Sequence, residues 1–429
     1  MKHIGILTNF TSYDKAYSLC NVASAQISTL RKHNYPVTVI VNEGFPPDSP
    51  YDEDILRFVP NVRCYNEIKI DDTFKQDVEN TYQRLKAIIE ERGIQTFITH
   101  DLIYQPAYLK VNHAARKIAE EFPNITWLHW IHSATSPTIL NDITLKSDEY
   151  LKTMQTPFPR SFIVYPNSYE IPRVARNMGY EEDQIRVVNH ATDIPRFFDF
   201  HPLSQKLCDK FDILSADIIG CYPLRLDRGK QPEYVIKIFK ALKENKCKVR
   251  LLIIDFHSTG GDKVAYREEL IRLRDNLGLS PSEVIFTSQV EQELHLSSPQ
   301  KLVRDFMLIS NLFVLPSKSE TYSLVVQEAG LCGNLLVLNQ DFPAMRSIYG
   351  NDTLYRQFSS NIDVNTGLDG ETNTKYGNEE GYWADLAKAI CYYIQNEKGL
   401  KMKTFLRKFR NPDAIFKKQI EPLFYADIK

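Results

Sequence analysis

Short apolar runs alternate with helically patterned stretches along this chain, and that order constrains its fold more than any other feature. Stretches with helical spacing lie at 15–32, 77–92 and 107–121. The runs that we interpret as strands are 4–8, 37–41, 95–99, 125–130, 162–165, 218–223, 249–254, 284–286, 312–315 and 335–338. Alternation of strands and helices is typical of parallel sheets covered by helices on both faces. The sequence therefore predicts an α/β protein with doubly wound, Rossmann-like sheets.

The length of the chain indicates more than one domain. Its 429 residues exceed what a single hydrophobic core usually serves. The first strand-and-helix series closes near 197–202, and a second begins at 218–223. We therefore predict an N-terminal domain over 1–200, a second domain over 201–384 and C-terminal helices over 385–429.

Composition favours a soluble protein of a reducing compartment. Hydrophobic residues make up 43% and charged residues 25% of the chain, as in ordinary globular domains. No apolar run approaches the roughly 20 residues that span a bilayer, and the N-terminus enters a strand without a signal peptide. The 7 cysteines are scattered, with no Cys-x-x-Cys pair. We expect a cytoplasmic protein with no metal site.

The stretch after the strand at 312–315 carries two carboxylates with a specific spacing. A Pro-Ser turn follows the strand, then Glu320, and then a helix that Thr321 or Ser323 could cap. Glu328 lies two turns into that helix. A helix N-terminus suits a phosphate, and a carboxylate can accept two hydrogen bonds from a ribose diol. The alternative is an ordinary turn with two surface glutamates.

A second motif places two cations after the strand at 218–223. Arg225 and Lys230 are five residues apart, roughly 90 residues before Glu320. Fixed cations neutralise the charge that develops on a diphosphate leaving group without reorganising. Arg228 lies close and either contributes or is solvated. A solvated turn is the alternative for the whole motif.

The Glu-x7-Glu spacing behind a Pro-Ser strand end resembles the GT4-type retaining glycosyltransferases of the GT-B fold. Arg225 and Lys230 match the Gly-Arg-Leu…Lys-Gly element of that family, although Pro223 stands where glycine is usual. The resemblance implies that Arg225 and Lys230 hold the donor diphosphate and that Glu320 meets the sugar hydroxyls. Glu328 would bind the ribose. The start of the helix, at Tyr322, Ser323 and Leu324, would add N–H donors to the donor nucleotide.

Two weaker matches lie in the first half of the chain. Residues 185–197 resemble the interdomain segment of the family, with His190 and Ala191 replacing its Asn-Gly pair. His132, just past the strand at 125–130, matches a histidine that reaches the donor sugar, with His129 as the runner-up. Alternation places these two side chains on opposite sides of a strand. The glycine-rich first loop of many relatives is absent, since 9–14 read Asn-Phe-Thr-Ser-Tyr-Asp.

The resemblance also implies an architecture and a mechanism. Two domains would face a cleft, with a C-terminal helix packed back on the first domain. Transfer would retain the anomeric configuration, and it would need neither a metal ion nor a cofactor. The donor would be a nucleotide-diphosphate sugar, with UDP- or GDP-sugar favoured.

The acceptor and some other functions stay open at this point. A glycan, a lipid-linked glycan or a protein is favoured over hydroxymethylated DNA, because residues 1–200 carry a formal charge of −4 and the rest +2. A basic stretch could contact phosphates or a membrane surface: Lys401, Lys403, Arg407, Lys408, Arg410, Lys417 and Lys418. A GT-B-fold epimerase or phosphorylase and a non-catalytic nucleotide-sugar-binding protein are the alternatives to a transferase.

Overall fold

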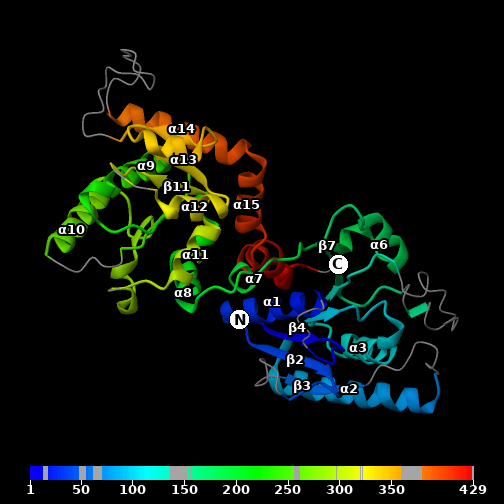
Figure 1. Ribbon diagram of the computed structural model, residues 1–429. Coiled ribbons are helices and arrows are strands. Elements are labelled where there is room, and N and C mark those ends of the chain that lie inside the picture. The colour runs from blue at the N-terminus through cyan, green and yellow to red at the C-terminus, as the bar shows by residue number, and fades with distance from the viewer. Residues whose placement is uncertain are drawn as a thin grey trace. The chain divides into compact units, whose positions relative to one another are not determined.

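The computed structural model divides the chain into two compact units (Figure 1). The first unit comprises Met1–Thr192 and Pro412–Lys429, and the second comprises Asp193–Asn411. The structure describes residues 1–12, 18–47, 55–60, 70–135, 152–153, 156–255, 261–295, 297–318, 320, 322–358 and 379–427. Thr321 and part of the first loop, at 13–14, therefore lie outside the described residues.

The first unit contains a parallel sheet of seven strands in the order β3-β2-β1-β4-β5-β6-β7. The strand order reverses direction after β1, as in doubly wound folds. The bounds are β1 (His3–Leu7), β2 (Val37–Asn42), β3 (Ile55–Val59), β4 (Ile94–His100), β5 (Thr126–Trp130), β6 (Ser161–Tyr165) and β7 (Ile185–Val187). Strands β1, β4, β5 and β6 are buried almost throughout, although polar residues such as Thr96, Thr99 and His129 stand among their apolar side chains.

Helices cover both faces of this sheet and form two hydrophobic cores. Leu85, Ile118 and Val174 belong to one core, and Ile27, Phe416 and Phe424 belong to the other. Local signals set the helix ends: Asp71 caps one helix by accepting a hydrogen bond from Phe74 N, and left-handed Gly93 ends it. The helices are α1 (Ser18–Lys32), α2 (Asp72–Arg92), α3 (Leu109–Glu121), α6 (Ile171–Met178) and α16 (Pro412–Ile415), with short turns η3 (Pro106–Tyr108), η4 (Glu182–Gln184), η9 (Phe416–Ile420) and η10 (Glu421–Tyr425).

The second unit contains a parallel sheet of six strands in the order β10-β9-β8-β11-β12-β13. The bounds are β8 (Ile218–Tyr222), β9 (Val249–Ile253), β10 (Val284–Phe286), β11 (Leu312–Leu315), β12 (Leu335–Asn339) and β13 (Leu354–Arg356). The strand order reverses between β8 and β11, so this is the switch point at which α/β sheets bind ligands. The expectation of two doubly wound, Rossmann-like domains is confirmed.

Helices again cover both faces of the second sheet. Phe239 and Leu386 pack on one face, and Leu207 and Phe306 pack on the other. The helices are α7 (Ile194–Phe197), α8 (Pro202–Phe211), α9 (Pro232–Glu244), α10 (Gly261–Asn276), α11 (Gln300–Ile309), α12 (Leu324–Leu331), α13 (Pro343–Tyr349), α14 (Glu379–Asn396) and α15 (Lys398–Phe409), with short turns η5 (Ile213–Ser215), η6 (Arg228–Lys230), η7 (Thr287–Gln289) and η8 (Gln292–Leu294).

The C-terminal region is divided between the units, which differs from the boundaries expected at 200 and 384. Helices α14 and α15 belong to the second unit, where Arg407 is buried and donates to the carbonyl oxygens of Leu214 and Ala216. Only 412–429 pack in the first unit, through apolar side chains such as Phe416 and Phe424. The second unit begins at Asp193, because α7 and α8 contribute Ile194 and Leu207 to its core.

No helix among the described residues combines the length and apolarity needed to cross a membrane.

Candidate functional site in the second unit

The two predicted motifs of the second unit meet at one edge of its sheet. Strands β8 and β11 are parallel neighbours, so the loops after their carboxyl ends emerge side by side. Lys318 N donates a hydrogen bond of 2.9 Å to Gly229 O and joins the loops. Lys230 Nζ lies 2.5 Å from Glu320 Oε1. The structure thus places Lys230, which was predicted to bind the diphosphate, beside Glu320, which was predicted to bind the sugar.

The Lys230–Glu320 ion pair is largely shielded from solvent. The Lys230 side chain is 20% exposed and the Glu320 side chain 12% exposed. Solvent screens such a pair less than it screens one at the surface. Lys230 and Glu320 therefore neutralise each other's charge.

The backbone around Lys230 is fixed by contacts to both strands. Tyr222 Oη, at the end of β8, donates a hydrogen bond of 2.7 Å to Lys230 O. Gln231 is buried in a left-handed conformation with φ of 53°. When its amide is oriented to satisfy both ends, the Gln231 nitrogen donates to Pro316 O at 2.7 Å. The loop after β8 is therefore held against the end of β11.

The two arginines of the second motif have different environments. Arg225 is 59% exposed, and its Nε lies 3.7 Å from Asp227 Oδ2. Arg228 donates to both carboxylate oxygens of Glu269 at 2.9 Å and lies over the Tyr266 ring. Arg228 is thus engaged by its neighbours, whereas Arg225 is held loosely enough to turn toward a ligand.

The start of α12 differs from the capped helix that the sequence predicts. Ser323 occupies the cap position, but its φ is 68° and its side chain makes no capping hydrogen bond. That expectation is therefore wrong for Ser323. The backbone is fixed instead by Tyr349 Oη, which donates to Ser323 O at 2.9 Å and to Tyr322 O at 3.1 Å. Tyr322 is 45% exposed and Leu324 is 67% exposed.

Glu328 is not part of the Lys230–Glu320 ion pair. It is exposed on α12, and no hydrogen bond or ion pair found among the described residues joins it to either partner. Its side chain lines a surface groove of about 490 Å³ between α11 and α12. The other residues that line the groove are Gln300, Lys301, Val303, Arg304, Met307, Leu331 and Cys332. The ribose-binding role of Glu328 stays a prediction.

The basic C-terminal stretch is partly committed to internal contacts. Lys403 Nζ donates to Cys332 O at 2.7 Å, and burial lowers the pKa of Lys403 to about 8. Arg407 is buried, and Lys408 pairs with Asp217. These three side chains support the fold of the second unit and so offer less to a polyanion than the sequence indicates.

The predicted histidine of the first unit lies just past β5. His132 is partly buried, and burial is the main reason why its pKa is lowered to about 4. His129 is fully buried instead, with its ring 4.5 Å from that of Phe158 and its Nδ1 2.8 Å from Thr99 Oγ1. Of the two candidates, only His132 is within reach of a ligand.

The sequence did not point to His100, which contacts His132, or to Gln26, which contacts His100. His100 Nδ1 lies 3.1 Å from His132 Nε2, and His100 Nε2 lies 3.0 Å from Gln26 Oε1. The one available signal was that β4 ends in histidine beside the end of β5. His190, of the segment resembling the interdomain stretch, stacks on His132 with ring centroids 5.6 Å apart.

Within the described part of the chain, no group of three or more His, Cys, Asp or Glu side chains is arranged to hold a metal ion.

One family model matches part of the chain. Residues 209–354 match the model of the family described as "Glycosyl transferases group 1". No curated protein matches the sequence. This matched segment contains β8, β11, Arg225, Lys230 and Glu320.

The solved structures that the chain resembles are distant in sequence. A glycosyltransferase from Rickettsia africae is 14% identical and covers 100% of both chains, with a TM-score of 0.35. Sucrose-phosphate synthase from Thermosynechococcus elongatus is 14% identical, covers 99% of this chain and 97% of its own, and has a TM-score of 0.34. Anabaena Alr3699/HepE in complex with UDP-glucose is 15% identical, covers 99% and 98%, and has a TM-score of 0.31. With TM-scores this low, the likenesses support no conclusion about activity. Residues 209–354, which hold the Lys230–Glu320 pair, are similar to the glycosyl transferases group 1 family model.

Proposed function

We propose that this protein is a retaining, metal-independent glycosyltransferase that uses a nucleotide-diphosphate sugar, with UDP- or GDP-sugar favoured. The observation that carries the proposal is the Lys230–Glu320 pair at 2.5 Å, formed at the strand-order switch point of a group 1 glycosyltransferase segment. Ligands of α/β sheets bind at such a point. The acceptor is a glycan, a lipid-linked glycan or a protein.

The pair explains how donor binding would reorganise the site. A diphosphate carries two or more negative charges and attracts Lys230 more strongly than a single carboxylate does. Lys230 and the loosely held Arg225 would move onto the phosphate oxygens, because arginine can engage two of them at once. Glu320 would then be free to accept hydrogen bonds from hydroxyls of the sugar. N–H groups at Tyr322, Ser323 and Leu324 would add donors near the phosphates.

The transfer step needs no protein nucleophile. The bond from the anomeric carbon to the phosphate oxygen breaks, and the acceptor oxygen bonds to that carbon on the same face. The proton of the acceptor hydroxyl passes to the leaving phosphate oxygen, so atoms and charge balance. Lys230 and Arg225 stabilise the charge that develops on the diphosphate. A double displacement would require a carboxylate placed as nucleophile, and Glu320 is assigned here to the sugar hydroxyls.

The environment of the basic C-terminal stretch supports the choice of acceptor. Lys403, Arg407 and Lys408 are used within the second unit. Duplex binding requires several free cations on phosphates. A glycan or a protein side chain makes no such demand, and modified DNA becomes the weaker candidate.

Two measurements test this proposal together. Thermal shift with UDP-, GDP- and ADP-sugars in EDTA identifies the donor, since a ligand at 100 times its Kd stabilises by about 2.7 kcal/mol. NMR of the product then gives the configuration at the anomeric carbon. We expect stabilisation without metal and a product with the configuration of the donor. Activity that appears only with added manganese or magnesium, or an inverted product, would overturn the mechanism.

A further inference from the structure

Three histidines of the first unit form a row at the carboxyl edge of its sheet. His100 ends β4, His132 follows β5 and His190 follows β7. The ring centroids of His100 and His132 are 5.4 Å apart with planes at 12°, and those of His132 and His190 are 5.6 Å apart at 19°. The ring of His132 is therefore held between two others.

A chain of hydrogen bonds continues from this row into the core. Gln26 Oε1, on α1, lies 3.0 Å from His100 Nε2, and His100 Nδ1 lies 3.1 Å from His132 Nε2. Gln26 and His100 are buried, with 6% and 1% of their surface exposed. Both contacts have ordinary hydrogen-bond lengths.

With the Gln26 oxygen turned toward His100, the chemistry of these groups determines where each proton lies. The Gln26 carbonyl oxygen can only accept, so His100 Nε2 must donate. A neutral imidazole carries a single N–H, which leaves His100 Nδ1 as an acceptor. His132 Nε2 must then donate to it. The remaining nitrogen, His132 Nδ1, bears a lone pair.

The three rings are held neutral, as this reasoning requires. Burial, together with the repulsion that a second histidine charge would add, lowers the pKa of His100 and of His132, and burial lowers that of His190. The backbone of His132 is also fixed, since its N–H donates to Asp101 Oδ1 at 3.1 Å. No hydrogen bond found within the described residues uses His132 Nδ1.

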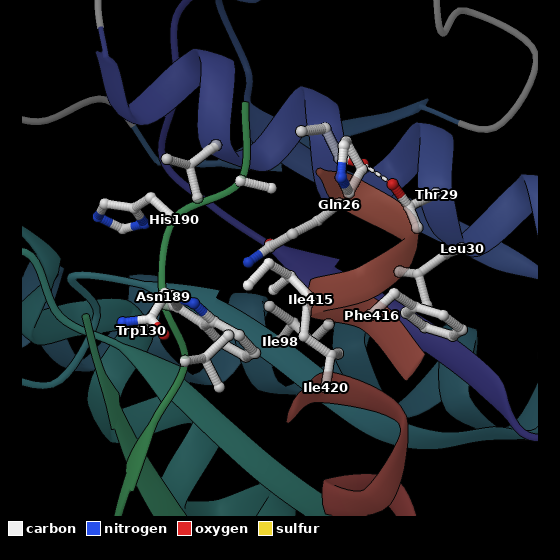
Figure 2. A pocket seen from close by; sticks show the side chains of 15 residues that line it. Gln26, Thr29, Leu30, Ile98, Trp130, Asn189, His190, Ile415, Phe416 and Ile420 are labelled. Atoms are coloured by element: carbon white, nitrogen blue, oxygen red, sulfur yellow. Dashed lines mark hydrogen bonds between the residues drawn. The ribbon is translucent and has the colours of Figure 1, made fainter. Parts of the chain in front are cut away.

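The adjoining cavity is too small to be the binding site. It has a volume of about 30 Å³ and lies between α1, the segment around Asn189 and the C-terminal residues Ile415 to Ile420 (Figure 2). Gln26 and His190 line it. Such a volume suits a water molecule and excludes a sugar. A ligand for His132 must therefore approach from the partly exposed side of its ring.

We propose that Gln26 and His100 are positioning residues that lock His132 in the tautomer protonated at Nε2, so that Nδ1 accepts a hydrogen bond from a substrate hydroxyl. This inference rests on the proposed function, which supplies a sugar as the ligand. Gln26 and His100 act through His132 and do not touch the substrate.

The proton positions can be measured without any substrate. Long-range ¹H–¹⁵N correlation NMR of the histidine-labelled full chain reports the protonated nitrogen of each ring, with His100→Gln and His132→Gln used for assignment. We expect His132 and His100 to carry their protons on Nε2. A His132 ring protonated on Nδ1 would overturn the inference.

Substitution of Gln26 tests whether the lock comes from the buried amide. In Gln26→Leu, His100 loses its fixed acceptor, so the His132 signals should move to a mixture of tautomers. The value of kcat/KM should fall about fivefold, the scale of one neutral hydrogen bond. Gln95→Leu, at an exposed position of β4, is the control and should change neither readout. An unchanged His132 tautomer in folded Gln26→Leu would contradict the positioning role.

The donor separates this inference from the proposed function. Saturating the protein with the nucleotide sugar that binds in calorimetry should shift the His132 Nδ1 signal, as a new hydrogen bond would. Binding without that shift overturns the contact to the substrate while the proposed function stands. If no nucleotide sugar binds, the proposed function fails and the substrate contact fails with it.

Discussion

The two units solve the same structural problem with opposite electrostatics. Both place their polar side chains past the carboxyl ends of central parallel strands. In the second unit these are charged: Lys230 and Glu320 pair at 2.5 Å while retaining 20% and 12% exposure. In the first unit they are neutral rings, and His100 is buried to 1% exposure. The fold determines where these side chains lie, and the degree of burial determines whether they are charged.

This contrast matches what each half of a transfer reaction would require. A diphosphate leaving group needs fixed positive charge, which the second unit can supply. A sugar hydroxyl needs a neutral acceptor of known orientation, and a histidine ring of fixed tautomer is one.

Loss of the cation should have the largest effect. Lys230→Ala removes charge that stabilises the leaving diphosphate and should lower kcat by about a hundredfold. The control is Lys237→Ala on α9, the helix that follows the Lys230 loop. Lys237 lies outside the site and pairs with Glu379 at 2.6 Å. Steady-state kinetics with the identified donor measure both. A wild-type rate in Lys230→Ala would remove the charged site from the mechanism.

Loss of the carboxylate should affect turnover and nucleotide binding in opposite directions. Glu320→Gln should lower kcat about thirtyfold, the scale of lost hydrogen bonds to a charged group. The free nucleoside diphosphate should bind about threefold more tightly, because Lys230 is no longer engaged by a partner. Calorimetry with UDP and GDP measures the second effect. Weaker binding would mean that the ion pair does not compete with the donor.

The second glutamate should act on affinity alone. Glu328→Ala should weaken nucleotide binding about tenfold if the carboxylate holds the ribose hydroxyls. Glu244→Ala, another exposed glutamate on a helix of the same unit, is the matched control. Unchanged affinity in calorimetry would leave Glu328 as a lining residue of the groove between α11 and α12.

The smallest effect concerns the pH dependence of stability. The pKa of His132 falls from 6.5 to about 4 on folding, so the unfolded chain binds more protons between these values and stability drops as pH falls. His100, whose pKa is also lowered, contributes to the same loss of stability at low pH. The pKa of Asp101 is raised to about 6, so the folded chain binds one more proton there, and this partly offsets the loss.

Thermal melts from pH 7 to pH 5 measure this dependence. His132→Gln should reduce the loss of Tm by roughly 3 °C, and His295→Gln, an exposed histidine of the second unit, should not. An equal loss of Tm in all three proteins would show that the neutral rings do not control acid stability.

Most of the fold could be predicted because its signals are local. The apolar runs at 284–286 and 312–315 coincide with β10 and β11. The sequence assigned Lys230 and Glu320 to the same donor molecule, but their pairing depends on β8 and β11 being neighbours in the sheet, which was not predicted. The short edge strands β3, β7 and β13 were missed, because a few residues at a sheet edge carry little pattern.

The parts that escaped prediction depend on contacts between distant segments. Gln26 is an ordinary polar residue of a helix until α1 is packed against β4, 74 positions along the chain. Arg407 belongs to a basic stretch in the sequence. In the structure it is buried in the second unit, where it donates hydrogen bonds to main-chain carbonyls near residue 215. Such partners have no local signature, so the division of the C-terminal helices was also missed.

Equilibrium binding of donors tests the central claim most directly, because it needs no acceptor. Isothermal titration of wild-type protein and Lys230→Ala with UDP-, GDP- and ADP-sugars in EDTA gives affinity and stoichiometry. We expect one donor to bind the wild type with a single site per chain and to bind Lys230→Ala at least tenfold more weakly, as for loss of a charged hydrogen bond. Equal affinity for both proteins, or no binding of any nucleotide sugar, would contradict it.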